Sequence, residues 1–367
     1  MKTYKHLWEK LITKSNFELA YQKSIKGKSK QRQIRKFNEN KEENLEAVRQ
    51  SVINGTFHTS EYREMKIYEP KERTIYKLPY SPDRIVQHAI MNILESILTN
   101  LMIENTYACI QDRGQIAASH KTSEYVRKYK YCLKCDIHKF YPSISQSKVS
   151  AMFHRIIKDD KFMALVDDVI FSFPGGYNCP IGNYLSQWCG NFYLTSLDNY
   201  VLHTLKPSGY VRFCDDFMLF SNDKQFLTEC RKKIEVFLWE TLELRYSKAD
   251  VFNVKQGVDF CGYRHFKKYV LIRKRTSKRI IRRFRKINKK VHNDDFNFEK
   301  AEGRIASDNG IMEHACAHHL RVSIKYDETK ALVLEEKEKK NEKSNLERRY
   351  DLPDYGRQQR SECVHPS

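Results

Sequence analysis

Three aspartates stand where an acidic side chain needs a specific reason to be. Asp136 ends the apolar run YCLKCD, and the pair Asp215 and Asp216 separates the apolar segments VRFC and FMLF. Burial opposes the ionisation of a carboxyl group, so acids between hydrophobic strands are costly unless a cation neutralises them. Two Mg²⁺ ions about 3.5 to 4 Å apart, held by three such carboxylates, would remove this cost and support phosphoryl transfer. For the aspartate pair alone, an exposed turn at a hairpin tip is the competing interpretation.

The surrounding pattern predicts a mixed α/β region that would position these acids. YCLKCDI is typical of a short strand, VRFCDDFMLF of a hairpin with the acids at its tip, and GVDFCGYRHF of a second hairpin. Residues 145–159 and 183–204 have helical patterns, and the loop FPGGYNCPIGN connects them.

The rest of the chain is mostly helical by the same criteria. Residues 1–50 predict helices, residues 61–80 two short strands around a turn, and the segment after Pro82 a helix whose apolar side recurs every four residues. The members of that side are Ile85, Ala89, Ile93, Ile97 and Leu101. Residues 276–325 predict further helices, and the charge-rich end predicts a solvated helix or a disordered tail.

Positive charge is concentrated in two segments. The 367 residues carry a formal net charge of +20, with seven basic and no acidic residues in 23–36 and eleven basic and no acidic residues in 273–290. The remainder is close to neutral. A polyanionic partner is therefore expected, either a nucleic acid or an anionic membrane surface, although a single basic run is also typical of a solvated face.

Hydropathy and cysteine usage favour a cytoplasmic protein without a membrane partner. No run approaches the roughly 18 uninterrupted apolar residues of a membrane span, and MKTYKHLWEK lacks a secretory apolar stretch. The ten cysteines are scattered, which favours reduced thiols. Cys132 and Cys135 are interpreted as core thiols and not as a zinc site, and the cluster EHACAHH is likewise not assigned to a metal.

Five ordered motifs resemble those of reverse transcriptases, over about residues 60–270. KCDIHKFYPSI resembles the first palm motif, and FCDD resembles the palm hairpin of the form aromatic, any residue, Asp, Asp. PKERTIYKLPYSPDRIVQHAI is similar to the fingers segment, PIGNYLSQ to the template and primer loop, and GVDFCGYRHF to the primer-grip hairpin.

This resemblance implies an α+β right-hand polymerase fold with fingers, an antiparallel palm sheet and a helical thumb. The implied divisions are an N-terminal helical extension at 1–60, fingers at 61–130, palm at 131–268, thumb at 269–325 and a charged tail at 326–367. The implied activity is RNA-directed DNA synthesis from deoxynucleoside triphosphates (dNTPs), with an RNA template and a cDNA duplex as partners.

The resemblance also assigns site residues. Asp136, Asp215 and Asp216 would be catalytic and would hold two Mg²⁺ ions, for which Mn²⁺ can substitute. Tyr141 would lie under the sugar and exclude a 2′-hydroxyl, although core packing accounts for a tyrosine there equally well. The other implied nucleotide-binding residues are Lys71, Arg73, Ile181, Gly182, Gln187 and Lys248. Arg84 is expected to be held by Asp83 or a carbonyl.

The loop PIGNYLSQ departs from the common pattern. Most reverse transcriptases have Gln before this Gly and Pro after the Ser, whereas this chain has Ile181 and Gln187. The variant resembles the enzymes of diversity-generating retroelements and some defence-associated relatives. An aliphatic side chain removes a hydrogen bond near the templating base, so low-fidelity copying is expected.

The second basic segment follows the primer-grip motif, where the family carries its thumb. Its cations recur every three or four residues with an apolar stripe between them, which predicts an amphipathic helix that contacts phosphates without reading sequence. The expected nucleic-acid-binding residues are Arg275, Lys278, Arg279, Arg282, Arg283, Arg285 and Lys286. Residues 23–36 could bind template RNA, a structured RNA or an accessory protein.

Three other functions remain open beside the leading one. An antiphage defence polymerase, protein-primed or non-templated, would use the same chemistry. A catalytically idle RNA-binding protein of polymerase-like fold is opposed by the intact Asp136, Asp215 and Asp216. An RNA-dependent RNA polymerase is opposed by Tyr141, because ribonucleotides need room at the 2′ position.

Overall fold

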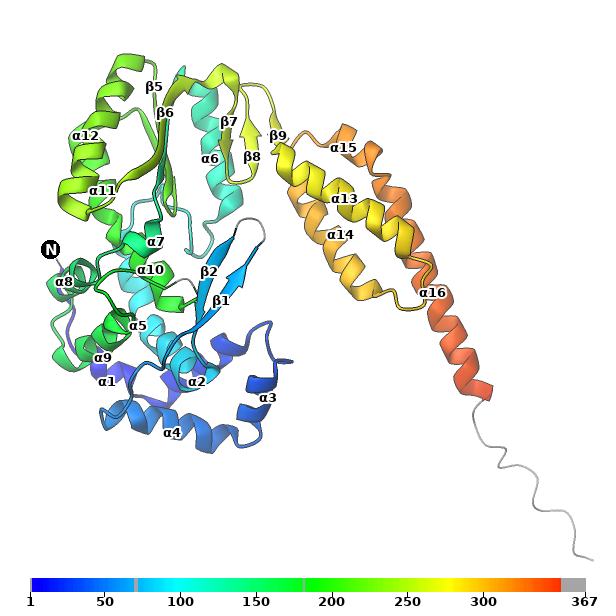
Figure 1. Cartoon of the computed structure of the whole chain (residues 1–367), viewed down its shortest axis with the longest axis horizontal. Coiled ribbons are helices and arrows are strands. Elements are labelled where there is room, and N and C mark those ends of the chain that lie inside the picture. Colours follow the sequence, from blue (N-terminus) through cyan, green and yellow to red (C-terminus); the bar gives the residue numbers. More distant parts are fainter. Residues whose placement is uncertain (1, 69–71, 181, 351–367) are drawn as a thin grey trace, which may run out of the picture. The chain divides into compact units, whose positions relative to one another are not determined.

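The computed structural model describes residues 2–68, 72–180 and 182–350. The chain divides into two compact units, Met1–Cys261 and Gly262–Ser367, and each is described by itself (Figure 1). This division falls a few residues before the palm and thumb boundary that the sequence suggested.

A four-stranded antiparallel sheet forms the centre of the first unit. Its strands are β3 (Tyr131–Ile137), β4 (Gly209–Phe213), β5 (Asp216–Ser221) and β6 (Tyr246–Asn253), in the order β4-β5-β3-β6. The strand at YCLKCDI and the hairpin at VRFCDDFMLF are confirmed. The sequence pattern predicts no element at β6, whose side chains are mostly polar and partly exposed, as is usual on a sheet edge.

Both faces of the sheet are covered. Alternate side chains of a strand point to opposite faces, and here Leu133 and Cys135 belong to a core shared with helix α12 (Lys224–Leu242). Cys132 and Met218 face the other way and join a second core with helix α6 (Gln115–Lys128). The sheet is therefore a rigid layer, and only its strand ends and turns are free to form a site.

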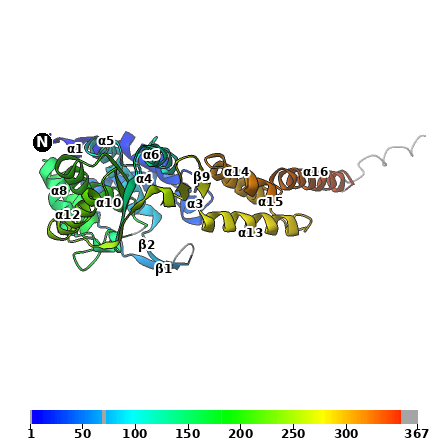
Figure 2. The same cartoon turned by 90° about the horizontal axis from the view of Figure 1, so that it is seen from above.

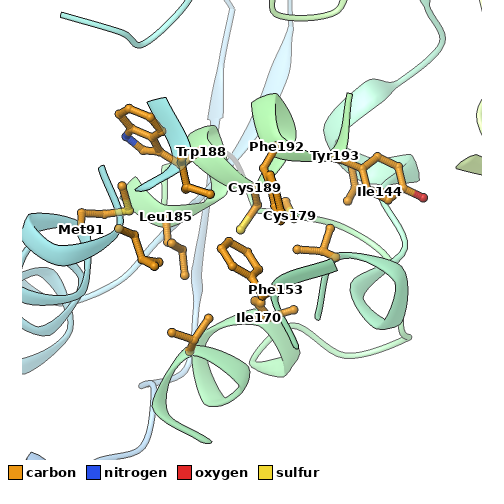
Figure 3. Packing of buried hydrophobic residues seen from close by; sticks show 14 of the residues in the cluster. Met91, Ile144, Phe153, Ile170, Cys179, Leu185, Trp188, Cys189, Phe192 and Tyr193 are labelled. Carbon is orange, nitrogen blue, oxygen red and sulfur yellow. The ribbon is translucent and has the colours of Figure 1, made fainter. Parts of the chain in front are cut away.

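The larger core continues into a group of helices below the sheet, α5 (Ile85–Leu101), α8 (Gln146–Ile156), α9 (Asp160–Phe171) and α10 (Tyr184–Tyr193). Phe153 of α8 packs on Phe192 of α10 with ring centroids 4.8 Å apart, and Trp188 is almost wholly buried beside them (Figure 3). The expected apolar side of α5 is confirmed, with Ile85 and Ala89 fully buried. Large aromatic side chains supply much of the apolar area that stabilises such a core.

Four helices and then a hairpin precede α5 in the sequence, and apolar residues of the helices belong to the same core. The helices are α1 (Leu7–Leu11), α2 (Lys14–Ile25), α3 (Arg32–Asn38) and α4 (Lys41–Ile53), and the hairpin pairs β1 (Arg63–Ile67) with β2 (Arg73–Lys77). Asn16 ties α2 to α5 because its amide nitrogen donates to the Ala89 carbonyl at 3.2 Å. The predicted turn of the hairpin includes residues 69–71, which lie outside the described residues.

Short elements complete the first unit. They are η1 (Tyr80–Arg84), α7 (Phe140–Ser143), α11 (Thr195–Asn199), η2 (Tyr200–Leu205), η3 (Val254–Gln256) and β7 (Val258–Phe260). The single helix expected over 183–204 is therefore three consecutive pieces, α10, α11 and η2.

The second unit is mostly helical. A short hairpin, β8 (Tyr263–His265) with β9 (Val270–Ile272), leads into α13 (Lys274–Lys290), α14 (Phe298–Glu313), α15 (His318–Ser323) and α16 (Tyr326–Tyr350) (Figure 2). The ring of Tyr326 lies 5.8 Å from that of Phe284 on α13. Residues 326–350 thus form a helix, which is one of the two alternatives expected for the charge-rich end, and this helix packs on α13 and α14. Residues 351–367 lie outside the described part.

No helix within residues 2–68, 72–180 and 182–350 is long and apolar enough to cross a membrane. The cytoplasmic location expected from cysteine usage stays a prediction.

Candidate active site

Two of the three predicted acids lie side by side on neighbouring strands of the central sheet. Asp136, next to the end of β3, is the register partner of Asp216, the first residue of β5. Both lie on the sheet face that carries Cys132 and Met218, because side chains two residues apart on a strand share a face. Asp215 lies in the turn between β4 and β5. The fold therefore brings all three carboxylates to one end of the sheet.

The surroundings of Asp215 and Asp216 disfavour their charged forms. Burial is the main cause that raises the pKa of Asp216 to about 6, and Asp136 and Asp215 add repulsion. Lys134 opposes this shift, since its ammonium lies 3.3 Å from one Asp216 oxygen. The pKa of Asp215 is also raised, chiefly by burial. Lys134, Arg73 and Arg212 therefore only partly offset the effect of burial on the two aspartates.

The donor set fits divalent cations. The second oxygen of Asp216 is buried and has no hydrogen-bond partner, so it is available as a ligand. Carboxylate oxygens are the ligands that Mg²⁺ prefers. One oxygen of Asp136 accepts a hydrogen bond from the Ser247 hydroxyl on β6. Within the described residues, no three His, Cys, Asp or Glu side chains are already spaced to hold a metal ion.

A buried ion pair holds the strand that leads to the turn at Cys214 and Asp215, which is called the catalytic turn below after the role expected of Asp215. Arg212 on β4 binds Asp198 on α11 through two nitrogens, at 2.8 and 2.5 Å, and both side chains are fully buried. The Tyr210 hydroxyl donates to the same carboxylate at 2.8 Å, and the Thr106 hydroxyl donates at 3.3 Å. Buried charges persist when they are paired and hydrogen-bonded in this way.

The same arginine reaches the turn itself. Its Nη1 donates to the Cys214 carbonyl at 3.1 Å and to the Asn191 side-chain oxygen at 3.2 Å. Cys214 has a left-handed backbone with φ of 54°, which is uncommon for a residue with a side chain. Arg212 thereby fixes the residue directly before Asp215. The motifs in the sequence do not predict this role, although an arginine within the apolar strand VRF indicates a buried partner.

Tyr141 lies beside the catalytic turn. Its ring packs against Gly190 on α10, where an added Cβ would lie 3.1 Å from the Tyr141 ring and equally close to Phe140. The pKa of Tyr141 is raised, mainly by burial and also by the nearby Cys214 and Asp215. A side chain at residue 190 would therefore press on the rings of both Tyr141 and Phe140.

Of the remaining predicted nucleotide-binding residues, Arg73 and Lys248 lie on described strands of the first unit. Arg73, the first residue of β2, is near enough for its charge to lower the pKa of Asp215. Lys248 on β6 is the register partner of Asp136, and its ammonium pairs with Asp250 at 2.9 Å. Lys71 and Ile181 lie outside the described residues.

The loop before α10 is packed closely against the β1–β2 hairpin, which is called the fingers hairpin below after the family segment that its sequence resembles. A Cβ at Gly182 would lie 2.7 Å from the Tyr76 carbonyl oxygen, and the φ of this glycine is 116°, so no other residue fits without strain. Asn183 caps α10 by accepting from the Leu185 amide. Gln187 is exposed and accepts a weak hydrogen bond from the Cys109 thiol at 3.6 Å.

A cavity of about 500 Å³ lies between the hairpin, α3 and the start of α10. It is lined by three cations and three glutamines, and none of its described lining residues is acidic. These six are Arg63, Lys77, Arg84, Gln31, Gln33 and Gln87. Asp83, the partner considered for Arg84, accepts instead from the Ser60 amide and hydroxyl at 2.8 and 2.7 Å.

The predicted amphipathic helix of the second unit is α13, with Ile280, Phe284 and Ile287 on its buried side. The exposed members of the predicted nucleic-acid-binding set are Arg275, Lys278, Arg279, Arg282, Arg285 and Lys286. Arg283 differs from them, because its guanidinium lies 2.6 Å from the buried carboxylate of Asp308 on α14. Arg283 therefore holds two helices together.

Comparisons with known proteins give the family. Residues 69–265, more than half of the chain, match the family described as reverse transcriptase (RNA-dependent DNA polymerase). No curated protein matches the chain.

Two solved telomerase structures are similar at 11% identity. Telomerase from Candida albicans, in complex with a TWJ fragment of telomeric RNA, has a TM-score of 0.44 over 62% of this chain and 51% of that chain. Apo telomerase from Candida tropicalis, truncated from its C-terminal domain, has a TM-score of 0.43 over 63% of this chain and 60% of that chain. This chain thus spans about half to three fifths of these telomerase chains.

The matched segment contains the central sheet, the catalytic turn and strand β2 of the fingers hairpin, so the α+β architecture is that of a right-hand polymerase. The chain belongs to the reverse transcriptase (RNA-dependent DNA polymerase) family.

Proposed function

We propose that this protein is an active RNA-directed DNA polymerase. The observation that carries the proposal is the register pairing of Asp136 with Asp216 beside Asp215, together with a buried Asp216 oxygen that has no partner. An idle member of the family would have no reason to keep three costly acids at one end of a sheet. Raised pKa values at Asp215 and Asp216 agree with a site that is completed by cations.

Asp136, Asp215 and Asp216 would hold two Mg²⁺ ions, with Mn²⁺ as a substitute. When bound, such ions lower the pKa of the primer 3′-hydroxyl and neutralise the triphosphate. The chain's own residues orient the site: Lys134 restrains Asp216, and the Ser247 hydroxyl donates to Asp136.

The nucleotide would lie between the catalytic turn and Tyr141. The ring of Tyr141, held against Gly190, would occupy the space that a ribose 2′-hydroxyl needs. Arg73 would contact the triphosphate, as would Lys71, which precedes it by two residues in the sequence. Lys248 would lie on the Asp136 side, and Gly182 and Gln187 on the side of the template and primer loop.

The template would enter through the cavity beside the fingers hairpin. Its three cations and three glutamines suit phosphates and base edges, and Gln31 and Gln33 come from the basic segment 23–36. The cDNA duplex would contact the exposed cations of α13. Of the three partners considered for segment 23–36, template RNA is therefore the one we propose.

For the biological role we propose error-prone copying in a diversity-generating retroelement. The support is the sequence PIGNYLSQ, with Ile181 where most of the family has an amide and with Gln187 exposed at the start of α10. A template repeat and a variable repeat encoded nearby would agree with this role. A neighbourhood of defence genes would instead favour the antiphage alternative.

The activity is tested by extension of a primed RNA template with dNTPs or NTPs in Mg²⁺ or Mn²⁺. We expect Asp215→Asn to reduce extension at least about a thousandfold, because a metal ligand is removed. Asp160→Asn, an exposed acid at the start of α9, is the matched control and should retain activity. Equal extension by wild type and Asp215→Asn would reject the proposal.

The fidelity is tested separately by sequencing products from an RNA template. Ile181→Gln should reduce misincorporation, above all opposite adenine. An unchanged spectrum would reject low fidelity set by this residue while leaving the polymerase proposal intact.

A further inference from the structure

One lysine of the central sheet contacts two other strands at the same time. The ammonium of Lys134 on β3 lies 3.3 Å from Asp216 Oδ2 on β5. It also donates a hydrogen bond to the carbonyl oxygen of Asp259 on β7 at 2.5 Å, and it lies 6.0 Å from the centre of the Phe260 ring. A carboxylate, a carbonyl and an aromatic ring are three groups that stabilise a partly buried ammonium.

The surroundings of Lys134 restrict its side chain. On β5 its register partner is Met218, so Asp216 is its diagonal neighbour on the same face of the sheet. Met218 and Phe260 are fully buried in the core that this face shares with α6. The Lys134 side chain is 22% exposed, so its stem follows apolar surface and its ammonium is placed where these strands meet.

Lys248, the other lysine beside the predicted acids, is held differently. It is the register partner of Asp136 on β6, but its side chain is 69% exposed and its ammonium pairs with Asp250 of the same strand. An exposed ion pair of this kind is weak. Of these two lysines, Lys134 is the one that connects an acid of the site to a strand outside the central sheet.

Strand β7 begins the motif GVDFCGYRHF, which resembles the primer-grip hairpin. Ahead of β7, the Val254 amide donates to the Lys130 carbonyl at 3.0 Å. Directly after β7, the Cys261 carbonyl accepts from the Gln115 side chain on α6. Both ends of this segment are therefore held by the body of the first unit, and Lys134 contacts its middle.

We propose that Lys134 is a positioning residue that couples β7 to the catalytic carboxylate of Asp216, so that the primer end and this carboxylate keep their relative positions during nucleotide addition. The inference rests on the proposed function and on the primer-grip role that the motif implies. Because Lys134 holds Oδ2 of Asp216, the buried Oδ1, which has no hydrogen-bond partner, keeps one direction. A shift of β7 moves the Asp259 carbonyl, and the ammonium transmits this shift to the carboxylate.

The first measurement is the rate of single-nucleotide addition by an excess of the full chain over a primed RNA template. Lys134→Met keeps the stem without the ammonium and should lower the maximal rate at least about tenfold, since a small misplacement of a reacting group is costly. The dNTP concentration that gives half of this rate should change by less than about twofold. Lys134→Arg retains a donor and should be faster than Lys134→Met. Lys130→Met, at an exposed lysine just before β3, is the matched control and should behave as wild type.

The second measurement is hydrogen–deuterium exchange of the full chain without nucleic acid, followed by mass spectrometry. Loss of the contact with Asp259 should speed the exchange of Val258–Phe260 at least about fivefold in Lys134→Met. The same segment should exchange as in wild type in Lys130→Met. Strand β4 should be unchanged in both variants, because Lys134 has no contact with it. A general loss of stability would instead speed exchange in β4 and β7 alike.

Three results would overturn the inference. They are equal addition rates in wild type and Lys134→Met, unchanged exchange of Val258–Phe260, and faster exchange that is as large in β4 as in β7. If wild type adds no nucleotide, the proposed function fails, whereas the exchange of β7 still decides whether Lys134 holds this strand. Failure of this proposal and failure of the proposed function are therefore distinguishable.

Discussion

The guanidinium of Arg212 and the carboxylate of Asp198 form a two-contact ion pair, at 2.5 and 2.8 Å, with both side chains fully buried. Arg212 also holds the carbonyl of Cys214. This buried ion pair thus anchors the catalytic turn through Arg212. A lone charge left in this position would be very costly.

Arg212→Met should therefore lower the free energy of unfolding by about 3 to 5 kcal/mol, because it leaves Asp198 buried and unpaired. The measurement is urea denaturation of the purified protein. The double variant Arg212→Met/Asp198→Leu should lose less than the sum of the two single variants. Lys41→Met, which breaks a partly exposed pair with Glu18, is the control and should cost about 1 kcal/mol or less. A strictly additive double variant would contradict the anchoring role.

The anchoring pair also shows what sequence patterns can and cannot predict. Strand β3, the hairpin around Asp215 and helix α13 follow from local apolar periodicity, so the sequence predicts them well. The contact of Arg212 with Asp198 cannot be predicted in this way, because it depends on how β4 packs against α11. Lys134 likewise meets Asp216 only because β3 pairs with β5. Edge strand β6 escaped prediction because its polar side chains carry no clear alternation.

Tyr141→Ala should weaken discrimination against ribonucleotides at least about tenfold, because it empties the space that the ring fills beside Gly190. The measurement is the ratio of kcat/KM for a dNTP to that for the matching NTP. Tyr141→Phe keeps the ring and should keep the ratio. Tyr177→Ala, at an exposed tyrosine, is the control. An unchanged ratio in Tyr141→Ala would restrict this residue to core packing.

His88 should make stability depend on pH. Burial is the first cause that lowers its pKa to about 4, and Arg84 and Lys28 add repulsion. Its ring stacks on Tyr184 at 4.5 Å, and its buried Nδ1 has no hydrogen-bond partner. The fold therefore favours the neutral imidazole of His88. The resulting contribution to the free energy of unfolding is complete above about pH 6.5, the ordinary histidine pKa.

As pH falls from about 6.5 toward 4, the unfolded chain binds a proton that the folded chain resists, so stability is lost. Wild type should lose about 1 to 2 kcal/mol more than His88→Phe between pH 7.5 and pH 5. The phenyl ring retains the stacking without the titrating group. Urea denaturation at the two pH values measures the difference. Equal losses in both proteins would contradict the prediction.

The exposed cations of α13 should set the salt dependence of nucleic-acid binding. The double variant Arg279→Gln/Lys286→Gln should reduce the slope of log K against log salt by about 2, since each phosphate contact contributes about 0.9. Lys330→Gln, an exposed lysine on α16, is the control. The measurement is fluorescence anisotropy with an RNA–DNA duplex over a series of salt concentrations.

Arg283→Gln should behave differently from its neighbours. It breaks the contact with buried Asp308, so thermal stability should fall while the salt slope changes little. A slope change as large as that of the other cations would show that Arg283 also contacts phosphate.

Gly182 has a mechanical consequence. Its missing side chain lets the backbone before α10 rest directly on the Tyr76 carbonyl of β2, and farther along α10 Gly190 receives the ring of Tyr141. Because neither contact has a side chain that could yield, we expect a displacement of the fingers hairpin to be transmitted along α10 to the ring of Tyr141. The hairpin and Tyr141 thus contact the same segment, the loop before α10 and α10 itself, each at a glycine.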